Sequence, residues 1–173
     1  FYTLTIFEVL ADYDYFLRLD DDSILETAPP RNFFEVMEER DYWFGYRAVA
    51  RRESHPATNA TLPQFVDDYL KSGCFERPPG FSLVASSYYS NFELSALEFW
   101  KRNDVWTFLK AIDANGGIYE YRWGDSPIHG YCVRLFCPPE RIWGFDDFVY
   151  LHASHDHRFE IGEQVMEELR RRG

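Results

Sequence analysis

Hydrophobic residues recur along the chain in two alternating patterns. Segments of strand composition, rich in aromatic and branched side chains, occur at 15–19 (YFLRL) and 42–47 (YWFGYR), and residues 118–123 (IYEYRW) alternate as a strand does. Elsewhere, as at 32–41 (NFFEVMEERD), the sequence has the pattern of a helix. Because strand-like and helix-like segments alternate, the pattern predicts a layered α/β domain with at least partly parallel strand pairing.

The remaining segments continue this alternation. A capping-box pattern followed by apolar residues predicts a helix from Leu62 to Ser72, and residues 81–100 are expected to start as a strand and become a helix near Glu93 or Leu94. Ser126 is expected to cap a helix that begins at Pro127. The other predicted elements are an opening helix with Leu4, Phe7 and Leu10 on one face, a helix with an apolar stripe from Val105 to Ile112, a late strand at 146–152 and a final amphipathic helix over 159–173.

Length and composition fit one globular domain. The chain has 173 residues, of which 46% are hydrophobic and 19% aromatic, enough to bury a real core, and no interdomain linker interrupts residues 1–173. With 29 acidic and 18 basic side chains, the formal net charge is -11. That balance argues against nucleic acid or an anionic membrane as the main partner and favours a cationic ligand or a metal ion.

Three consecutive carboxylates follow the first predicted strand. Asp20, Asp21 and Asp22 stand at its C-terminal end, where α/β sheets bind their ligands. Carboxylates so close together repel one another, and Mg²⁺ or Mn²⁺ can offset that repulsion while completing its shell with substrate phosphate oxygens. The tripeptide therefore suggests a metal-diphosphate site, and a solvated acidic turn is an equal alternative.

A histidine cluster follows the last predicted strand. The stretch HASHDH places three histidines between His152 and His157, close to Asp156. This spacing does not supply the fixed geometry of a zinc site, but a neutral imidazole can join a Mn²⁺ shell. The residues alone leave open which histidine, if any, binds a metal, and a metal-dependent hydrolase would also account for the aspartates and histidines.

Two further carboxylates stand beside aromatic residues that could lower the local dielectric and so shift the carboxyl pKa values. Glu93 follows Asn91-Phe92, and Asp125 belongs to the stretch RWGDSP. A structural role is the alternative for each, since Glu93 could stabilise the first turn of a helix and Asp125 could cap the next one. Trp123 could stack on a sugar ring, although in so aromatic a chain most such residues fill the core.

Together these segments resemble a known family. The run from Ser90 to Phe136, the stretch FDDFVYLHASHDH and the segment YDYFLRLDDDS are similar to the catalytic part of glycosyltransferase family 15, the fungal α-1,2-mannosyltransferases that extend mannose on N- and O-linked glycans. The resemblance covers nearly the whole chain. The matching motifs, in the family's order and spacing, are Asn91-Phe92-Glu93, Gly116-Gly117, Arg122-Trp123-Gly124-Asp125, Pro127 and His129.

The resemblance implies a fold and a reaction. It implies a GT-A fold, a mixed sheet flanked by helices, and a retaining transfer of mannose from GDP-mannose to a glycan or glycoprotein acceptor with Mn²⁺ as cofactor. The family's N-terminal Rossmann-like strands would precede Phe1, so residues 1–173 are expected to be the metal and acceptor half of the domain. The family's setting implies the Golgi lumen and a type II membrane protein, with its anchor outside this chain.

Site residues carry over position by position. The resemblance implies Asp20, Asp22 and His152 as metal ligands, although Asp20 replaces a glutamate that is one methylene longer. Glu93 corresponds to the family's proposed nucleophile, and Asp125 is expected to be catalytic as well. The residues expected to bind substrate are Asn91, Arg122, Trp123, Asp21 and His129.

Two alternatives share the fold but differ in function. One is a carbohydrate-binding or partner-binding module that does not catalyse, because part of the nucleotide pocket is expected to lie upstream. The other is a GT-A enzyme that uses a different sugar nucleotide, such as UDP-galactose or UDP-glucose.

Overall fold

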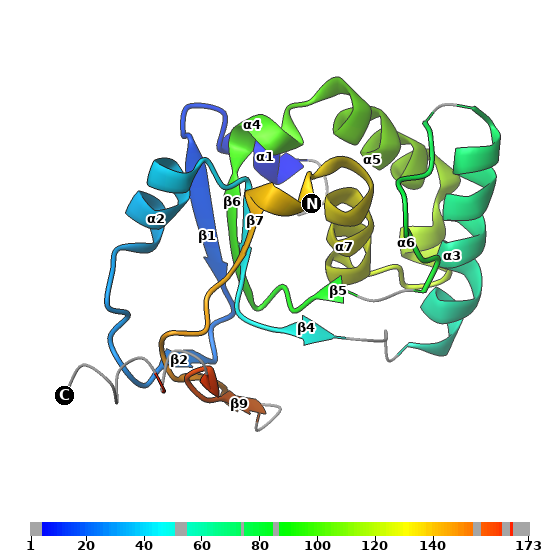
Figure 1. Cartoon of the computed structure of the whole chain (residues 1–173). Coiled ribbons are helices and arrows are strands. Elements are labelled where there is room, and N and C mark those ends of the chain that lie inside the picture. The colour runs from blue at the N-terminus through cyan, green and yellow to red at the C-terminus, as the bar shows by residue number, and fades with distance from the viewer. Residues whose placement is uncertain are drawn as a thin grey trace.

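The centre of the molecule is a four-stranded mixed sheet with the strand order β1-β6-β3-β7 (Figure 1). Strand β6 runs antiparallel to both of its neighbours, whereas β3 and β7 are parallel. The computed structural model describes residues 5–50, 55–73, 75–84, 87–153, 157–163 and 167. The four strands are β1 (Tyr15–Leu19), β6 (Phe92–Ala96), β3 (Phe44–Tyr46) and β7 (Ile142–Gly144). This sheet confirms the prediction of an α/β domain with partly parallel pairing.

Helices cover the sheet on both sides. Figure 1 places α2 on one side of the sheet and α7, α5 and α3 on the other. Strand β6 is buried throughout, with Phe92 and Leu94 packed in the core under α2 and Glu93 directed at α7. The helices are α1 (Thr5–Val9), α2 (Phe33–Arg40), α3 (Pro56–Lys71), α4 (Leu97–Trp100), α5 (Asn103–Asn115), α6 (Gly117–Glu120) and α7 (Asp125–Phe136), with a 3-10 turn at Pro139–Arg141.

Two small sheets extend from the central one. The first has the order β2-β8-β9, with antiparallel pairing throughout, and the second pairs β4 with β5. In the first sheet Ser23 lies opposite His152, which brings the last part of the chain to the aspartates after β1. The strands are β2 (Ser23–Leu25), β8 (Tyr150–His152), β9 (His157–Phe159), β4 (Val49–Ala50) and β5 (Ser87–Tyr88).

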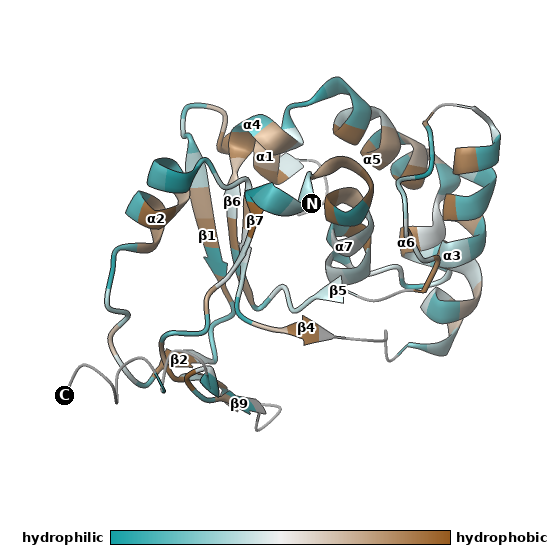
Figure 2. Cartoon of the chain, viewed as in Figure 1, coloured by the Kyte–Doolittle hydropathy of each residue, from teal (hydrophilic) through white to brown (hydrophobic). Residues whose placement is uncertain are grey.

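Apolar residues are concentrated where the helices pack on the central sheet. In Figure 2, β1 is brown through its middle and turns teal at its C-terminal end, where the aspartates follow. The core packs in two groups, a larger one among the helices α3, α5 and α7 and a smaller one under α2. Within the part of the chain that the structure describes, no helix has the length and apolar character needed to cross a bilayer.

Two of the predicted elements and one predicted helix cap were wrong. The expected helix at Glu93 is strand β6, which continues to Ala96, because pairing with β1 and β3 outweighs local helix preference. The expected strand at 118–123 contains helix α6, since Gly116 takes a left-handed conformation (φ 78°) that ends α5 and lets a new turn begin. Helix α7 has Gly124 at its N-cap, while the Ser126 hydroxyl donates to the Tyr88 carbonyl.

One helix boundary also differs from the prediction. Helix α3 begins at Pro56, six residues before the expected start, and it keeps Pro63 inside it. Most of the expected final helix over 159–173 lies outside the described residues.

Candidate active site

The structure brings together Asp20, Asp22 and His152. Asp20 follows β1 directly, and the Ser23 amide donates to the Asp20 carbonyl at 3.0 Å, which closes a tight turn around Asp22. His152 ends β8, the strand paired with β2. One ligand atom from each of the three side chains lies within 4.8 Å of the other two. These are the three residues that the sequence predicts as metal ligands.

The donor atoms of this cluster suit a divalent cation. His152 Nε2 lies 3.0 Å from Asp22 Oδ1 and 3.6 Å from Asp20 Oδ2, and the His152 ring is buried. The other ring nitrogen, Nδ1, lies 3.2 Å from the Tyr89 hydroxyl. Two carboxylates and one imidazole match the ligands that Mn²⁺ takes, and an outer hydrogen bond of this kind fixes the orientation of a ligating histidine.

Two tyrosines beside the cluster remain neutral. Burial raises the pKa of Tyr89, and the negative charges of Asp20 and Asp22 raise it further. Burial also raises the pKa of Tyr150 to about 12, with the same two carboxylates adding to the effect and a hydrogen bond from Ser23 opposing it. Both phenols therefore keep their protons at neutral pH and remain hydrogen-bond donors.

Arg18 connects the metal cluster to Asp125. Its Nη2 lies 3.1 Å from Asp20 Oδ1, and its Nη1 donates to Asp125 Oδ2, which also accepts a bond from Ser90 Oγ at 3.3 Å. Burial acts to raise the pKa of Asp125, but the charge of Arg18, with a contribution from His129, outweighs burial and holds the pKa below its ordinary value. Asp125 is therefore a carboxylate at neutral pH.

Arg18 was not among the site residues predicted from the sequence. The available signal was a lone charge inside the otherwise apolar strand YFLRL, two residues before Asp20 and so on the same face of β1 as the start of the acidic turn. The partnership with Asp125, 107 positions away in the chain, depends on tertiary packing.

Glu93 and His129 form a hydrogen-bonded pair of buried side chains between strand β6 and α7. Both residues are about 1% exposed, and His129 Nδ1 lies 3.1 Å from Glu93 Oε1 and 3.0 Å from Oε2. Glu93 pairs across the sheet with Arg18, and His129 is four residues after Asp125 on α7. Because cross-strand partners and residues four apart on a helix are neighbours, the two pairs occupy one interface between the sheet and α7.

Asn91 contributes a buried amide to the same region. Its backbone carbonyl accepts bonds from the Asp20 amide at 3.2 Å and from the Tyr150 hydroxyl at 3.0 Å. The side chain is 3% exposed, and neither Oδ1 nor Nδ2 has a hydrogen-bond partner among the described residues. A buried amide without partners destabilises a fold, by about 1–3 kcal/mol.

Replacing Asn91 with Leu is therefore expected to stabilise the protein. Leu removes the unpaired amide at similar side-chain length, and a gain of about 1 kcal/mol corresponds to a melting temperature about 2–4 °C higher in a chain of this size. Thermal unfolding followed by circular dichroism measures the change. A melting temperature lower by several degrees would show that the amide has a stabilising partner and would contradict this account.

Three of the predicted substrate-binding residues do not take part in the buried contacts of the candidate site. Asp21 is exposed in the turn between the two predicted metal ligands, and Arg122 is exposed with a left-handed backbone (φ 58°). Trp123 is 3% exposed, and its indole donates to Thr61 Oγ1 at 2.8 Å, so it lies in the core against α3. His155 and Asp156 lie outside the described residues, and the His157 side chain is not described.

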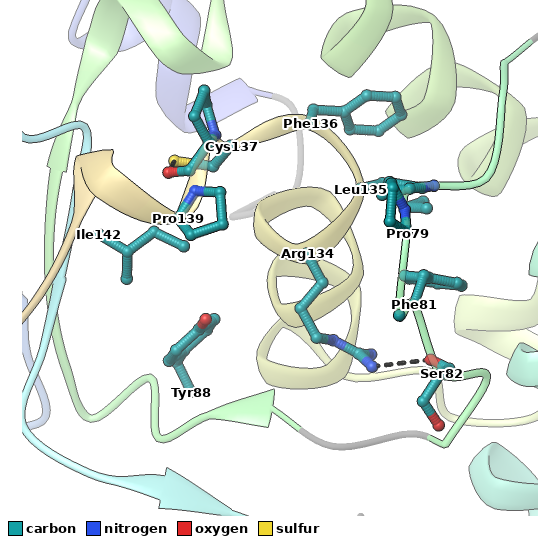
Figure 3. A pocket seen from close by; sticks show the side chains of 13 residues that line it. Pro79, Phe81, Ser82, Tyr88, Arg134, Leu135, Phe136, Cys137, Pro139 and Ile142 are labelled. Atoms are coloured by element: carbon teal, nitrogen blue, oxygen red, sulfur yellow. Dashed lines mark hydrogen bonds between the residues drawn. The ribbon is translucent and has the colours of Figure 1, made fainter.

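A separate cavity of about 750 Å³ opens at the other end of α7 (Figure 3). Its walls are mostly apolar and include Phe81, Tyr88, Cys137 and Ile142. The Arg134 side chain lines the cavity and donates a hydrogen bond to the Ser82 carbonyl at 3.0 Å. Its lining contains none of the carboxylates described above, so this cavity is separate from the candidate site.

Comparison with protein families and curated proteins gives one consistent result. The family model described as glycolipid 2-alpha-mannosyltransferase matches residues 1–164. Glycolipid 2-alpha-mannosyltransferase 1 of Candida albicans is 30% identical over 155 residues, which cover 84% of this chain and 36% of that protein. Glycolipid 2-alpha-mannosyltransferase of Saccharomyces cerevisiae is 27% identical over 160 residues, and alpha-1,2 mannosyltransferase KTR1 of the same yeast is 26% identical over 156. The chain thus spans 36–39% of the length of these three relatives.

Solved structures give the same fold. Core-mannan synthase A from Aspergillus fumigatus, in its Mn/GDP form, superposes with a TM-score of 0.71 at 23% identity and covers 83% of this chain and 43% of that one. The mannosyltransferase Ktr4p from S. cerevisiae, in complex with GDP, has a TM-score of 0.73 at 21% identity and covers 84% and 41%. The chain therefore has the mixed α/β fold of these GT-A-type proteins.

Proposed function

Because this chain belongs to glycosyltransferase family 15, the glycolipid 2-alpha-mannosyltransferases, we propose that it transfers mannose from GDP-mannose to a glycan or glycoprotein acceptor. The transfer forms an α-1,2 linkage and retains the configuration of the anomeric carbon. The observation that carries the proposal is the convergence of Asp20, Asp22 and His152 at the C-terminal end of β1, where α/β folds bind ligands. The Mn/GDP form of core-mannan synthase A supports the choice of Mn²⁺ and of a guanosine diphosphate donor.

The three clustered side chains would hold the metal ion. Asp20 and Asp22 would each supply a carboxylate oxygen, and His152 would supply Nε2. A ligating Nε2 must be deprotonated, so Nδ1 would carry the ring proton. Nδ1 would then donate a hydrogen bond to the Tyr89 hydroxyl, 3.2 Å away. When bound, Mn²⁺ neutralises negative charge on the leaving diphosphate.

Glu93 supplies the carboxylate that retention requires. In a double displacement, a Glu93 oxygen bonds to the anomeric carbon as the bond to the diphosphate breaks. The acceptor oxygen then displaces Glu93, and the hydroxyl proton passes to the released diphosphate. In a same-face attack, the Glu93 carboxylate instead stabilises the positive charge that develops at the anomeric carbon. Both routes need an ionised carboxylate held in one orientation, and the pairing with His129 supports that requirement.

Other residues position the substrates. Asp125, held by Arg18 and Ser90, offers its carboxylate to a sugar hydroxyl or to the acceptor. Asn91 offers an amide whose hydrogen-bonding capacity is unused among the described residues. Asp21 and Arg122 are exposed and remain candidates for substrate contact, whereas Trp123 acts from the core by supporting the start of α7.

The family membership also motivates a location. We propose the Golgi lumen of a eukaryote as its location and a type II membrane protein as its form. Its partners are the nucleotide sugar and the glycan acceptor, and the net charge of -11 disfavours nucleic acid.

A donor screen tests the proposed function. The chain is incubated with Mn²⁺, methyl α-mannoside and, in separate reactions, GDP-mannose, UDP-glucose and UDP-galactose. Transfer from GDP-mannose is expected, with an α-1,2-linked product identified by NMR and with activity lost in EDTA. Transfer from a UDP-sugar would show a different donor, and the absence of Mn²⁺-dependent GDP binding together with the absence of transfer would favour a non-catalytic module.

A further inference from the structure

We infer that His129 is a positioning residue that fixes the orientation of the Glu93 carboxylate for the transfer reaction. The inference rests on the proposed function, and it gives His129 a role different from the substrate contact that the sequence suggests. The feature that carries it is a buried imidazole whose Nδ1 is shared between both oxygens of one buried carboxylate.

The contact between the two side chains fixes the carboxylate plane. The distances from His129 Nδ1 to Oε1 and Oε2 are 3.1 Å and 3.0 Å, so neither oxygen is preferred. A carboxylate only accepts hydrogen bonds, so Nδ1 carries the proton that lies between the two oxygens. His129 Nδ1 lies within hydrogen-bond distance of both Glu93 oxygens, and Arg18 across the sheet binds Asp20 and Asp125.

The imidazole is itself held in place by aromatic rings. The His129 ring lies 4.4 Å from the Trp100 ring and 6.0 Å from the Phe7 ring, measured between centroids, and Phe7 stacks on Trp100 at 4.8 Å. Trp100 is anchored in turn, since its indole donates to Ser95 Oγ at 2.7 Å. The orientation of His129 is therefore set by packing that does not involve a substrate.

The contact of His129 with Glu93, which is equally buried, separates a positioning role from a substrate contact. His129 is 1% exposed, lies on α7 behind strand β6, and points its Nδ1 at Glu93. A group in that position acts on a bound sugar through Glu93. Loss of the hydrogen bond is therefore expected to slow the chemical step and to leave ground-state binding of the donor nearly unchanged.

Two variants separate the hydrogen bond from the packing. His129→Asn places an amide nitrogen close to the position of Nδ1 and keeps a donor for Glu93. His129→Phe fills the space beside Trp100 and Phe7 but removes the donor. We expect His129→Phe to lower kcat about 100-fold with KM for GDP-mannose changed less than about threefold, and His129→Asn to recover most of the loss.

Steady-state kinetics on the folded variants, checked by thermal unfolding, decide between the outcomes. A His129→Phe enzyme with wild-type kcat overturns the inference. A rise in KM with kcat unchanged in both variants also overturns it, because it indicates a direct substrate contact.

An NMR measurement keeps this test distinct from that of the proposed function. In ¹⁵N-labelled protein, the His129 ring signals are expected to show a proton on Nδ1 and to shift when Glu93 is replaced by Gln. If the wild type transfers no mannose, the proposed function fails, and the NMR result still decides whether His129 holds Glu93. Ring signals that show no proton on Nδ1, or that do not respond to Glu93→Gln, would overturn the inference by themselves.

Discussion

Replacing Glu93 with Gln is expected to lower kcat on the order of 10⁴-fold and leave Mn²⁺-dependent GDP binding within about threefold of wild type. The amide has no negative charge to attack the anomeric carbon or to stabilise a developing oxocarbenium ion. The fold is expected to survive, since the side chains have the same shape and the Gln carbonyl oxygen can accept the bond from His129 Nδ1. Glu93 is therefore expected to act in the bond-breaking and bond-forming step and to contribute little to the affinity for GDP.

The measurement pairs mannose transfer with isothermal titration of GDP in Mn²⁺. Glu35→Gln is the matched control, because it makes the same chemical change on the exposed surface of α2 and is expected to retain wild-type transfer. Transfer by Glu93→Gln within tenfold of wild type would remove Glu93 from the reaction. A large loss of GDP affinity would instead assign Glu93 to donor binding.

Replacing Asp22 with Asn is expected to raise the Mn²⁺ concentration needed for half-maximal transfer by at least about 100-fold. The change keeps the shape of the side chain but replaces a charged oxygen by a neutral one, 3.0 Å from His152 Nε2. Asp22 is preferred to Asp20 for this test, because Asp20 also binds Arg18 and its loss would disturb Asp125.

A metal titration of activity gives the comparison. Asp113→Asn on the exposed side of α5 makes the same change of charge and is expected to leave the Mn²⁺ response unaltered. An equal shift in both variants would mean that the effect reflects overall charge. An unchanged response in Asp22→Asn would exclude this carboxylate from the metal site.

Much of the fold was predictable because local patterns and tertiary structure agree. Strand β1, helix α2 with its cap Asn32 and helix α5 with its stop at Gly116 follow from short-range signals. Strand β6 was not predictable in this way. It is buried on both faces and continues directly into α4 at Leu97, so its apolar run had neither strand alternation nor a turn to separate it from the helix.

The sequence predicted several residues of the candidate site but not the long-range hydrogen bonds between them. The family resemblance selected His152 from three histidines that spacing could not distinguish, and the structure places it beside Asp20 and Asp22. The strand that positions it, β2, has only three residues and gave no sequence signal. Long-range partners such as Arg18 with Asp125 depend on packing between β1 and α7, which local sequence does not encode.

Burial explains why Trp123 does not contribute its side chain to the candidate site. Trp123 belongs to the most recognisable motif of the chain, yet its ring packs so closely on Gly117 that a Cβ there would lie 2.5 Å from it. That contact joins α6 to the start of α7. The motif Arg-Trp-Gly-Asp therefore combines a core residue, which places the helix, with a carboxylate that the helix presents to Arg18.

Isothermal titration of Mn²⁺ into the wild-type chain, with and without GDP, tests the metal site most directly. The account predicts that a single Mn²⁺ ion binds, that GDP tightens its binding, and that both effects disappear in Asp22→Asn. Binding of GDP at equal affinity in EDTA, or equal Mn²⁺ affinity in the wild type and Asp22→Asn, would contradict it.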